Sequence, residues 1–458
     1  MPGTRRSAQG EGGGAPAARR QRVKQRVYYS FHVPKGGVGK TRTVHAEAYA
    51  LAYRGLNVLV VDCDHQRDLT HCFFGNEIAE SYQHNYDDFR SGSGPAPRTL
   101  YESVLPLLRP GNQPTPPPNP LQKLARDPNG EHGSIHVILG DKNTSNLNVK
   151  IGMAWNVAAN DPTKLEIPGA PFAMIARAAE SVDADVILLD LHPDLGPLNC
   201  MLIMSCDYRL QPVEADSPSL EAMWNAEERI MRGHGLSPED KPWTEIYQEW
   251  VTLTHDAING SGKFSSGALD LRGHHVRNVK CKFMGIIMNK FTTERRDDGL
   301  AQGVCKDLPA SAVVTWMRQQ FKDVYKIASE YGEYAVGQRN YDKRLSGHAQ
   351  RNYLLRVVGR VPNFAKLNGV SHEQRMPPSY VHSPADKRSI LRVRRIYDQI
   401  AYNMLHITYL DNPDLLNHVK PKDLTEEGRG GPPIPGLHFH DPDEMDKLQR
   451  DLGPHWPA

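Results

Sequence analysis

The chain has 458 residues, with 55 Lys and Arg against 53 Asp and Glu, so the formal net charge at pH 7 is only +2. Hydrophobic residues make up 39% and charged residues 24%, which is enough apolar material for a packed core and excludes a wholly disordered chain. No apolar stretch is long enough to span a bilayer, and the basic N-terminus lacks the apolar core of a secretory signal, so we expect a cytoplasmic protein without a membrane partner. The six cysteines form no C-x-x-C pair that would suggest a zinc site.

The N-terminal segment, residues 1–26, is predicted to be a disordered basic arm. It holds seven Arg or Lys against one Glu, among Gly, Ala, Ser and Pro. A mobile cationic arm can bind nucleic-acid phosphates without sequence preference by releasing counterions. A solubilising leader with no partner is the alternative interpretation.

The next segments predict a phosphate-binding loop. A β-rich run at residues 27–33 precedes Lys35-Gly36-Gly37-Val38-Gly39-Lys40-Thr41, and an alanine-rich helical pattern follows at 43–54. This fits G-x-x-x-x-G-K-[ST], except that Pro34 stands at the first glycine. In such a loop the backbone N–H groups turn onto phosphates, the lysine contacts the β and γ oxygens, and the hydroxyl binds Mg²⁺. The strand, loop and helix order favours this site over an inert turn.

Further apolar runs predict an α/β fold, a doubly wound and mainly parallel sheet with P-loop NTPase architecture and helical insertions. Helical patterns separate strands expected at 58–62, 135–139, 186–190, 207–213, 282–289 and 356–361. Ligands of such sheets bind beyond the carboxyl ends of the strands. The loop at 35–41, Asp64, Asp190 and Asn289 all fall there.

Three insertions are expected, near residues 106–130, 229–279 and 292–350. The first is proline-rich and predicts an extended surface loop from Pro106 to Pro128. The second contains a predicted helix from Trp243 to Leu253, and the third contains a helical pattern from Ser311 to Tyr331. We interpret the insertions as partner-recognition surfaces, with an enlarged helical layer as the alternative.

The C-terminal part predicts a basic helix followed by an irregular tail. Arg388, Arg392 and Arg395 fall on one helical face, which suits a DNA-backbone patch or, alternatively, an ordinary solvated face. Residues 409–458 are rich in Pro, Asp and Gly, and their single His-x-His at 438–440 is a weak metal signal. The expected organisation is therefore a basic arm at 1–26, an ATPase domain at 27–408 and a tail at 409–458.

The motifs between Val27 and Leu405 resemble, in order, those of the ParA/MinD family of deviant Walker A partition and positioning ATPases. The lysine-initiated loop resembles the deviant Walker A box, Asp62, Asp64 and Gln66 resemble the D-x-D-x-Q element, and residues 186–196 resemble the Walker B segment. Three positions depart from the family's pattern, since Arg42 replaces a threonine and His65 and His192 each replace a proline. None of these changes removes a phosphate or Mg²⁺ ligand.

The resemblance implies roles for individual residues, with ATP and Mg²⁺ as the cofactors. The catalytic residues would be Lys40, Asp64, which would orient the attacking water, and Lys35, which would reach the phosphates of a partner subunit in a nucleotide sandwich dimer. Thr41 and Asp190 would hold Mg²⁺, Asp190 through water. The nucleotide-binding residues would be Gly36, Gly37, Val38, Gly39, Lys40, Thr41 and Arg42, with Asn289 at the adenine edge and Pro362 near its face. The DNA contacts would be Lys366, Arg388, Arg392 and Arg395.

The function implied by the resemblance is ATP-dependent partitioning or positioning of a plasmid, chromosome or other cargo. The expected partners are a second copy of the chain in the ATP state, non-specific DNA and a ParB-like adaptor, and the protein would be nucleoid-associated. One alternative is a nucleotide-switched regulator or defence component that gates a partner protein. Another is a MinD-like membrane positioner, which the lack of a clear amphipathic helix in the tail counts against.

Overall fold

The computed structural model describes residues 24–77, 97–105, 117–128, 132–158, 164–214, 216–231, 233, 241–259, 277–295, 301–304, 357–362, 367–383 and 386–416. The predictions for the basic arm before residue 24, for the segment from Ser311 to Tyr331, for Lys366 and for residues 438–440 lie outside these residues.

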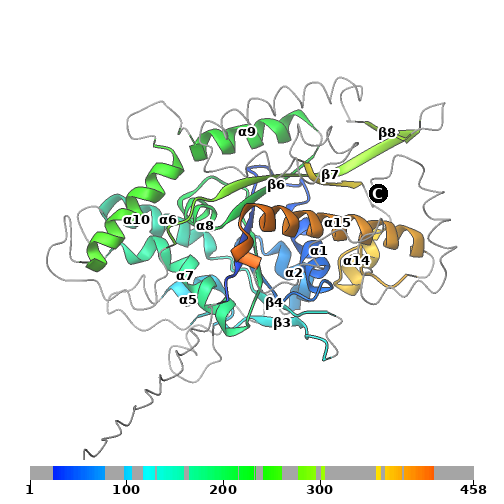
Figure 1. Cartoon of the computed structure of the whole chain (residues 1–458), viewed down its shortest axis with the longest axis horizontal. Helices are drawn as coiled ribbons and strands as arrows, with labels where there is room; N and C mark the ends of the chain where they lie inside the picture. The colour runs from blue at the N-terminus through cyan, green and yellow to red at the C-terminus, as the bar shows by residue number, and fades with distance from the viewer. Residues whose placement is uncertain are drawn as a thin grey trace, which may run out of the picture.

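Within the described residues, a nine-stranded sheet forms the centre, with the order β3-β4-β2-β5-β1-β6-β7-β8 and with β9 also paired to β7 (Figure 1). β1, β2, β4, β5, β6, β7 and β9 are parallel to their neighbours along the main sheet, whereas β3 and β8 pair antiparallel. The strands are β1 (Val27–Phe31), β2 (Val58–Asp62), β3 (Leu121–Leu124), β4 (Ile135–Ile138), β5 (Val186–Asp190), β6 (Tyr208–Glu214), β7 (Lys282–Arg295), β8 (Ala301–Val304) and β9 (Val357–Pro362).

The central strands read as continuous apolar runs because both of their faces are covered. Every residue of β1, β2 and β5 is buried, as expected for the middle of a parallel sheet. The register pairs Asp190 with both Phe31 and Asp62, so the three strands end at the same level. The polar side chains that follow these strands therefore meet at one edge of the sheet.

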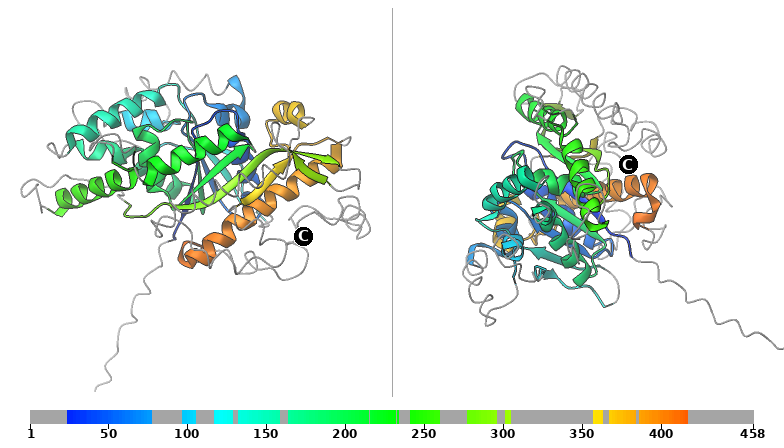
Figure 2. Two further views of the ribbon diagram at one scale, coloured as in Figure 1. Left: turned by 90° about the horizontal axis from the view of Figure 1, so that it is seen from above. Right: turned by 90° about the vertical axis from the view of Figure 1, so that its left-hand side faces the viewer.

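Helices cover both faces of the sheet (Figure 2). On one face, α1 (Lys40–Ala52), α2 (Asp68–Phe74) and α15 (Lys387–Asp411) share an apolar core, and α14 (Asn368–Gln374) lies near them. The other apolar core takes side chains from α5 (Leu100–Val104), α6 (Thr144–Ala158), α7 (Glu166–Ser181), α8 (Pro197–Ser205), α9 (Ser217–Met231) and α10 (Trp243–Asn259). No helix within the described part of the chain combines the length and apolar character that crossing a membrane requires.

The contact between α1 and α15 contains polar groups as well as apolar ones. Glu47 of α1 is fully buried, and neither of its carboxylate oxygens has a hydrogen-bond partner among the described residues. Burial, and then the charge of Asp398, raise the pKa of Glu47 well above its ordinary value, although Arg54 lowers it. Arg394 of α15 stacks over two aromatic rings, with its guanidinium carbon 5.0 Å from the ring centre of Tyr53 and 4.6 Å from that of Tyr380.

All seven predicted strands are present, and the predicted basic helix is α15. The helix predicted from Trp243 to Leu253 is also present as α10, which continues to Asn259. Two strands were not predicted. β3 falls inside the segment predicted to be an extended proline-rich surface loop, where Leu121 and Leu124 pack against the core beside β4. β8 pairs with the extension of β7 beyond residue 289, which was predicted to be the start of an insertion.

Candidate nucleotide site

The loop between β1 and α1 has the backbone that a phosphate cradle requires. Gly37 and Gly39 have φ of 78° and 83°, a left-handed conformation that only glycine adopts without strain. A Cβ atom on Gly39 would lie 3.0 Å from the side-chain nitrogen of Asn289. Both glycines are therefore required by the backbone, and the loop leads directly into the N-terminus of α1, where N–H groups attract anions.

Asn289, near the carboxyl end of the sheet on β7, supports the loop. Its side-chain N–H₂ donates to the Val38 carbonyl at 2.9 Å and contacts the Thr43 hydroxyl at 3.0 Å. The side chain is only 4% exposed. The structure thus gives Asn289 a role in holding the loop, while its contact with an adenine edge stays a prediction.

Lys40 and Asp190 form a buried ion pair at the base of the loop. The Lys40 Nζ atom lies 2.6 Å from Asp190 Oδ1, and the two side chains are 7% and 0% exposed. Asp190 Oδ2 is buried and has no hydrogen-bond partner within the described part of the chain. Burial raises the pKa of Asp190, and the Lys40 cation and the Thr41 hydroxyl partly oppose this shift.

These residues fit Mg²⁺. The unpartnered Asp190 oxygen and the nearby Thr41 hydroxyl are hard oxygen donors, and Mg²⁺ binds few such donors while retaining several waters. Asp190 pairs with Lys40, and the negative charge of Asp64 also acts on Asp190. A divalent cation beside Asp190 would compensate this excess negative charge.

Asp62 and Asp64, which follow β2, have different surroundings. Asp62 Oδ2 accepts hydrogen bonds from the Thr70 backbone N–H at 2.8 Å and hydroxyl at 2.7 Å, so Asp62 fixes the start of α2. Burial, and then the charge of Asp190, raise the pKa of Asp62 to about 7, although the Thr70 hydrogen bonds lower it. Asp64 Oδ1 accepts from the Gln66 backbone N–H at 2.8 Å.

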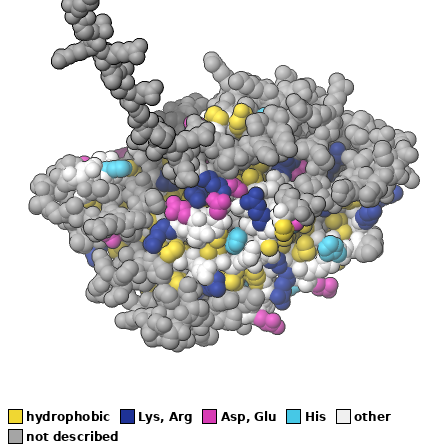
Figure 3. Space-filling view, turned by 60° about the horizontal axis from the view of Figure 1, so that its bottom comes forward, with side chains coloured by type: hydrophobic (Ala, Val, Ile, Leu, Met, Phe, Trp, Pro, Cys, Tyr) yellow, Lys and Arg dark blue, Asp and Glu magenta, His cyan; other side chains and the backbone are white. Residues whose placement is uncertain are grey.

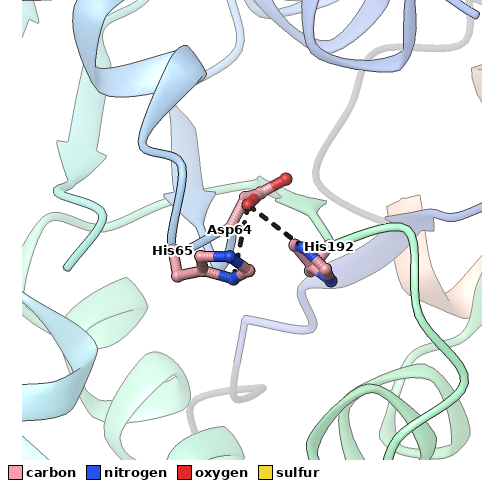
Figure 4. A group of neighbouring side chains, drawn as sticks. All are labelled: Asp64, His65 and His192. Carbon is pink, nitrogen blue, oxygen red and sulfur yellow. Dashed lines mark ion pairs between the residues drawn. The ribbon is translucent and has the colours of Figure 1, made fainter. Parts of the chain in front are cut away.

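Two histidines stand beside Asp64 (Figure 4). His65 Nδ1 and His192 Nε2 both lie 3.9 Å from Asp64 Oδ1, and the two imidazole rings are 4.2 Å apart. His192 Nδ1 lies 3.0 Å from Asp194 Oδ2. Sequence analysis identified each histidine as a departure from the family's pattern but did not place them together.

His32, which sequence analysis also missed, contacts the segment that follows β5 and contains His192. Its Nε2 atom is 2.6 Å from the Asp194 carbonyl. Burial lowers the pKa of His32 to about 4, so this ring is neutral near pH 7 and donates to the carbonyl. A histidine just after β1 gave no sequence signal of this contact, because its partner lies far along the chain.

Lys35 does not join Lys40 at the base of the loop. Its Nζ atom donates to Asp216 Oδ1 at 2.8 Å, to Asp216 Oδ2 at 2.7 Å and to the Ser219 hydroxyl at 2.9 Å. Burial by itself would raise the pKa of Asp216, but the hydrogen bonds from Lys35 and Ser219 bring it below its ordinary value. Asp216 lies in the connection between β6 and α9, and Ser219 lies in the first turn of α9. Neither was a predicted site residue.

The other predicted residues have different partners. Arg42 is exposed, and its guanidinium donates to the Asn368 side chain at 3.0 Å. Pro362 ends β9, paired with Phe291 of β7. On α15, Arg388 is exposed, whereas Arg392 and Arg395 are half-buried. The face shown in Figure 3 carries Lys and Arg interspersed with Asp and Glu, so its charges are mixed in sign.

Comparison with known proteins relates this site to a family. A model of the CobQ/CobB/MinD/ParA nucleotide binding domain matches residues 30–323. A curated protein of Thermus thermophilus, described as a probable plasmid-partitioning protein ParA, is 29% identical over 206 residues, which are 44% of this chain and 50% of that protein. The chain thus spans about half the length of the curated relative it matches.

Two solved structures are also similar. The ParA of pNOB8 is 15% identical with a TM-score of 0.49, over 84% of this chain and 99% of that one. An ATP complex of Cyanothece McdA is 14% identical with a TM-score of 0.44, over 84% of this chain and 96% of that one. The family model alone covers more than half of the chain, including the glycine loop, Asp64 and Asp190. The chain therefore belongs to the CobQ/CobB/MinD/ParA family of nucleotide-binding domains.

Proposed function

We propose that this protein is a ParA-like ATPase that dimerises around two ATP molecules, binds DNA non-specifically and uses hydrolysis to partition or position a plasmid, chromosome or other cargo. The observation that best supports the proposal is that one loop presents two lysines to different surroundings. Lys40 is buried against Asp190, while Lys35 is 24% exposed and contacts Asp216. A loop that only bound nucleotide within one subunit would need Lys40 alone.

In the proposed reaction, the protein supplies position and charge. Lys40 would exchange Asp190 for the β- and γ-phosphate oxygens, and the backbone N–H groups of the loop would hold the same phosphates. Thr41 and Asp190 would hold Mg²⁺, which supplies charge neutralisation to the phosphates. Asp64 would orient the attacking water. Phosphoryl transfer needs little more than such positioning and charge stabilisation.

Lys35 would act on the ATP of the partner subunit. To do so, it would leave Asp216 and Ser219 and extend across the dimer interface, where a second cation stabilises the charge of the transferred phosphoryl group. Hydrolysis would remove the group that Lys35 contacts and would favour dissociation. This coupling makes the dimer a nucleotide-dependent state.

Similarity to another protein and the basic residues of this chain support DNA and an adaptor protein as its partners. The Thermus thermophilus relative is described as a plasmid-partitioning protein, and the chain offers a basic N-terminal segment and the exposed Arg388. Contacts of this kind neutralise phosphates without reading sequence. We propose a ParB-like adaptor as the partner that stimulates hydrolysis.

Two lysine variants test the proposal. Lys40→Ala should lose ATP binding, whereas Lys35→Ala should bind ATP in one subunit but lose both ATP-dependent dimerisation and turnover. Lys150→Ala is a matched control, because Lys150 is an exposed lysine on α6. Analytical ultracentrifugation with Mg²⁺ and ATP, together with phosphate release, measures both properties. Dimerisation and turnover of Lys35→Ala at wild-type levels would contradict the proposed role of the lysine.

A further inference from the structure

We propose that Asp64, His65 and His192 form a site for a divalent transition metal of the Zn²⁺ class, and that the bound metal slows ATP hydrolysis without preventing ATP binding. The inhibitory part rests on the proposed function, because it requires that Asp64 orients the attacking water. The metal site itself depends only on the side chains shown in Figure 4.

The three side chains offer a donor set that suits such a metal. Two imidazole nitrogens and one carboxylate oxygen are common Zn²⁺ ligands, and their atoms all lie within 4.8 Å of one another. Donors that bind one tetrahedral Zn²⁺ at about 2.0 to 2.1 Å lie about 3.4 Å apart. The two contacts of 3.9 Å with Asp64 Oδ1 need only small side-chain rotations to reach this spacing.

The neighbours of His192 fix its orientation. Asp194 Oδ2 lies 3.0 Å from His192 Nδ1, where it can accept an N–H, and Nε2 is the nitrogen that faces Asp64. Asp194 is itself held, because Asn199 donates to its Oδ1 at 2.7 Å and the Gly196 backbone N–H donates to the same atom at 3.0 Å. A carboxylate that orients a histidine in this way is a common feature of metal sites, where it fixes the ring and raises the basicity of the ligand.

The two histidines pair with Asp64 as ions only when their rings are protonated, and neither is held to it by a hydrogen bond. At 3.9 Å, both nitrogens are too far from Asp64 Oδ1 to form hydrogen bonds. His192 Nε2 faces a carboxylate oxygen, an arrangement that a cation bound between the two atoms would stabilise. The side chains of His65 and His192 are 30% and 25% exposed, so a metal can enter and keep a water as a fourth ligand.

The site differs in chemistry from the Mg²⁺ site. Thr41 and Asp190 supply hard oxygens, which suit Mg²⁺, whereas imidazole nitrogens suit Zn²⁺, Co²⁺, Ni²⁺ or Cu²⁺. A metal bound to Asp64 would occupy the carboxylate oxygen that would otherwise orient water. Lys40 and the backbone of the loop would remain available to the phosphates.

The binding test uses the untagged full-length chain in metal-free buffer without nucleotide. His438→Gln and His440→Gln are introduced into every sample to remove the His-x-His of the tail. Titration with Co²⁺, followed by its visible absorbance, and with Zn²⁺, followed by calorimetry, should show one site per chain. His65→Gln and His192→Gln should each weaken binding at least tenfold, and Asp194→Asn should weaken it about 10- to 100-fold. His372→Gln, an exposed histidine on α14, should bind as the parent does.

The functional test adds Zn²⁺ to the Mg²⁺-ATP reaction of the same proteins. We expect the parent to lose at least tenfold in turnover while it still binds a fluorescent ATP analogue, and we expect the His65→Gln, His192→Gln double variant to be insensitive. Equal metal affinity in the parent and the double variant would overturn the site. Metal binding without any ATPase activity would uphold the site and contradict the proposed function, whereas turnover without metal binding would do the reverse.

Discussion

The contact between Lys35 and Asp216 predicts that the acidic residue restrains dimerisation. If Lys35 must leave Asp216 and Ser219 before it reaches the partner's ATP, every dimer has to break this contact twice. Asp216→Ala removes the carboxylate, and with it two of the three hydrogen bonds that hold the lysine in each subunit. The variant should therefore form the ATP-dependent dimer at lower protein concentration than the wild-type protein.

The size of the effect follows from the geometry and the exposure. The ammonium group makes three hydrogen bonds of 2.7 to 2.9 Å, two of them to Asp216. Charge-assisted hydrogen bonds contribute about 1.5 to 3 kcal/mol, but both side chains are about a quarter exposed, so we discount the contact to about 1 kcal/mol. Two contacts per dimer amount to about 2 kcal/mol, or roughly a 30-fold decrease in the dimer dissociation constant.

Sedimentation velocity over a range of protein concentrations, with Mg²⁺ and a slowly hydrolysed ATP analogue, measures this constant. Asp414→Asn removes an exposed acid elsewhere and should have no effect. In a Lys35→Ala background, Asp216→Ala should not restore ATP-dependent dimerisation, because there is no lysine to release. A dissociation constant for Asp216→Ala that equals or exceeds the wild-type value, with unchanged circular dichroism, would refute the restraint.

Three further predictions concern stability, the loop and DNA. The folded-state pKa of Glu47 lies above the unfolded value, so its contribution to stability is greatest below the unfolded pKa and is lost as the pH rises toward the folded pKa. In urea unfolding at pH 8, Glu47→Gln should therefore be about 1 kcal/mol more stable than the wild-type protein. The difference should be smaller at pH 5. Gly39→Ala should weaken binding of a fluorescent ATP analogue about tenfold or more, since the left-handed backbone alone costs about 1 to 2 kcal/mol, whereas Gly36→Ala meets no atom within 4 Å and should change binding less. Arg388→Ala should reduce the salt dependence of DNA binding by about one phosphate contact. Arg394→Ala should lower stability by about 1 kcal/mol through its lost aromatic stacking.

The central strands could be predicted because strands that are buried on both faces are made almost entirely of apolar residues. Val58–Asp62 and Val186–Asp190 are apolar at every position but the last, and a polar residue marks the edge where each strand ends. The edge strand β3 could not be predicted in this way. Its four residues mix apolar and polar side chains and are half-buried or exposed, so only their pairing with β4 makes them a strand.

The glycine loop could be predicted because its chemistry is local. All of its conformational requirements fall between Lys35 and Thr41, so spacing alone identifies them. The partners of its lysines are not local, since Asp216 lies 181 residues from Lys35 and Asp190 lies 150 residues from Lys40. Asp190 was nevertheless found, because it ends an apolar strand, whereas Asp216 stands in a connection with no periodicity to mark it.

His65 and His192 show that a fold can bring two separate substitutions together into one cluster. Taken singly, each position has merely lost a proline that the family commonly has, and neither change predicts any chemistry. The register of the sheet pairs Asp62 with Asp190, so the residues that follow these two strands come to lie side by side. Together, the two substitutions place two imidazole nitrogens beside one carboxylate, each 3.9 Å from Asp64 Oδ1. The two histidines meet only because the two strands end at the same level. The strand register therefore identifies this cluster, and sequence spacing does not.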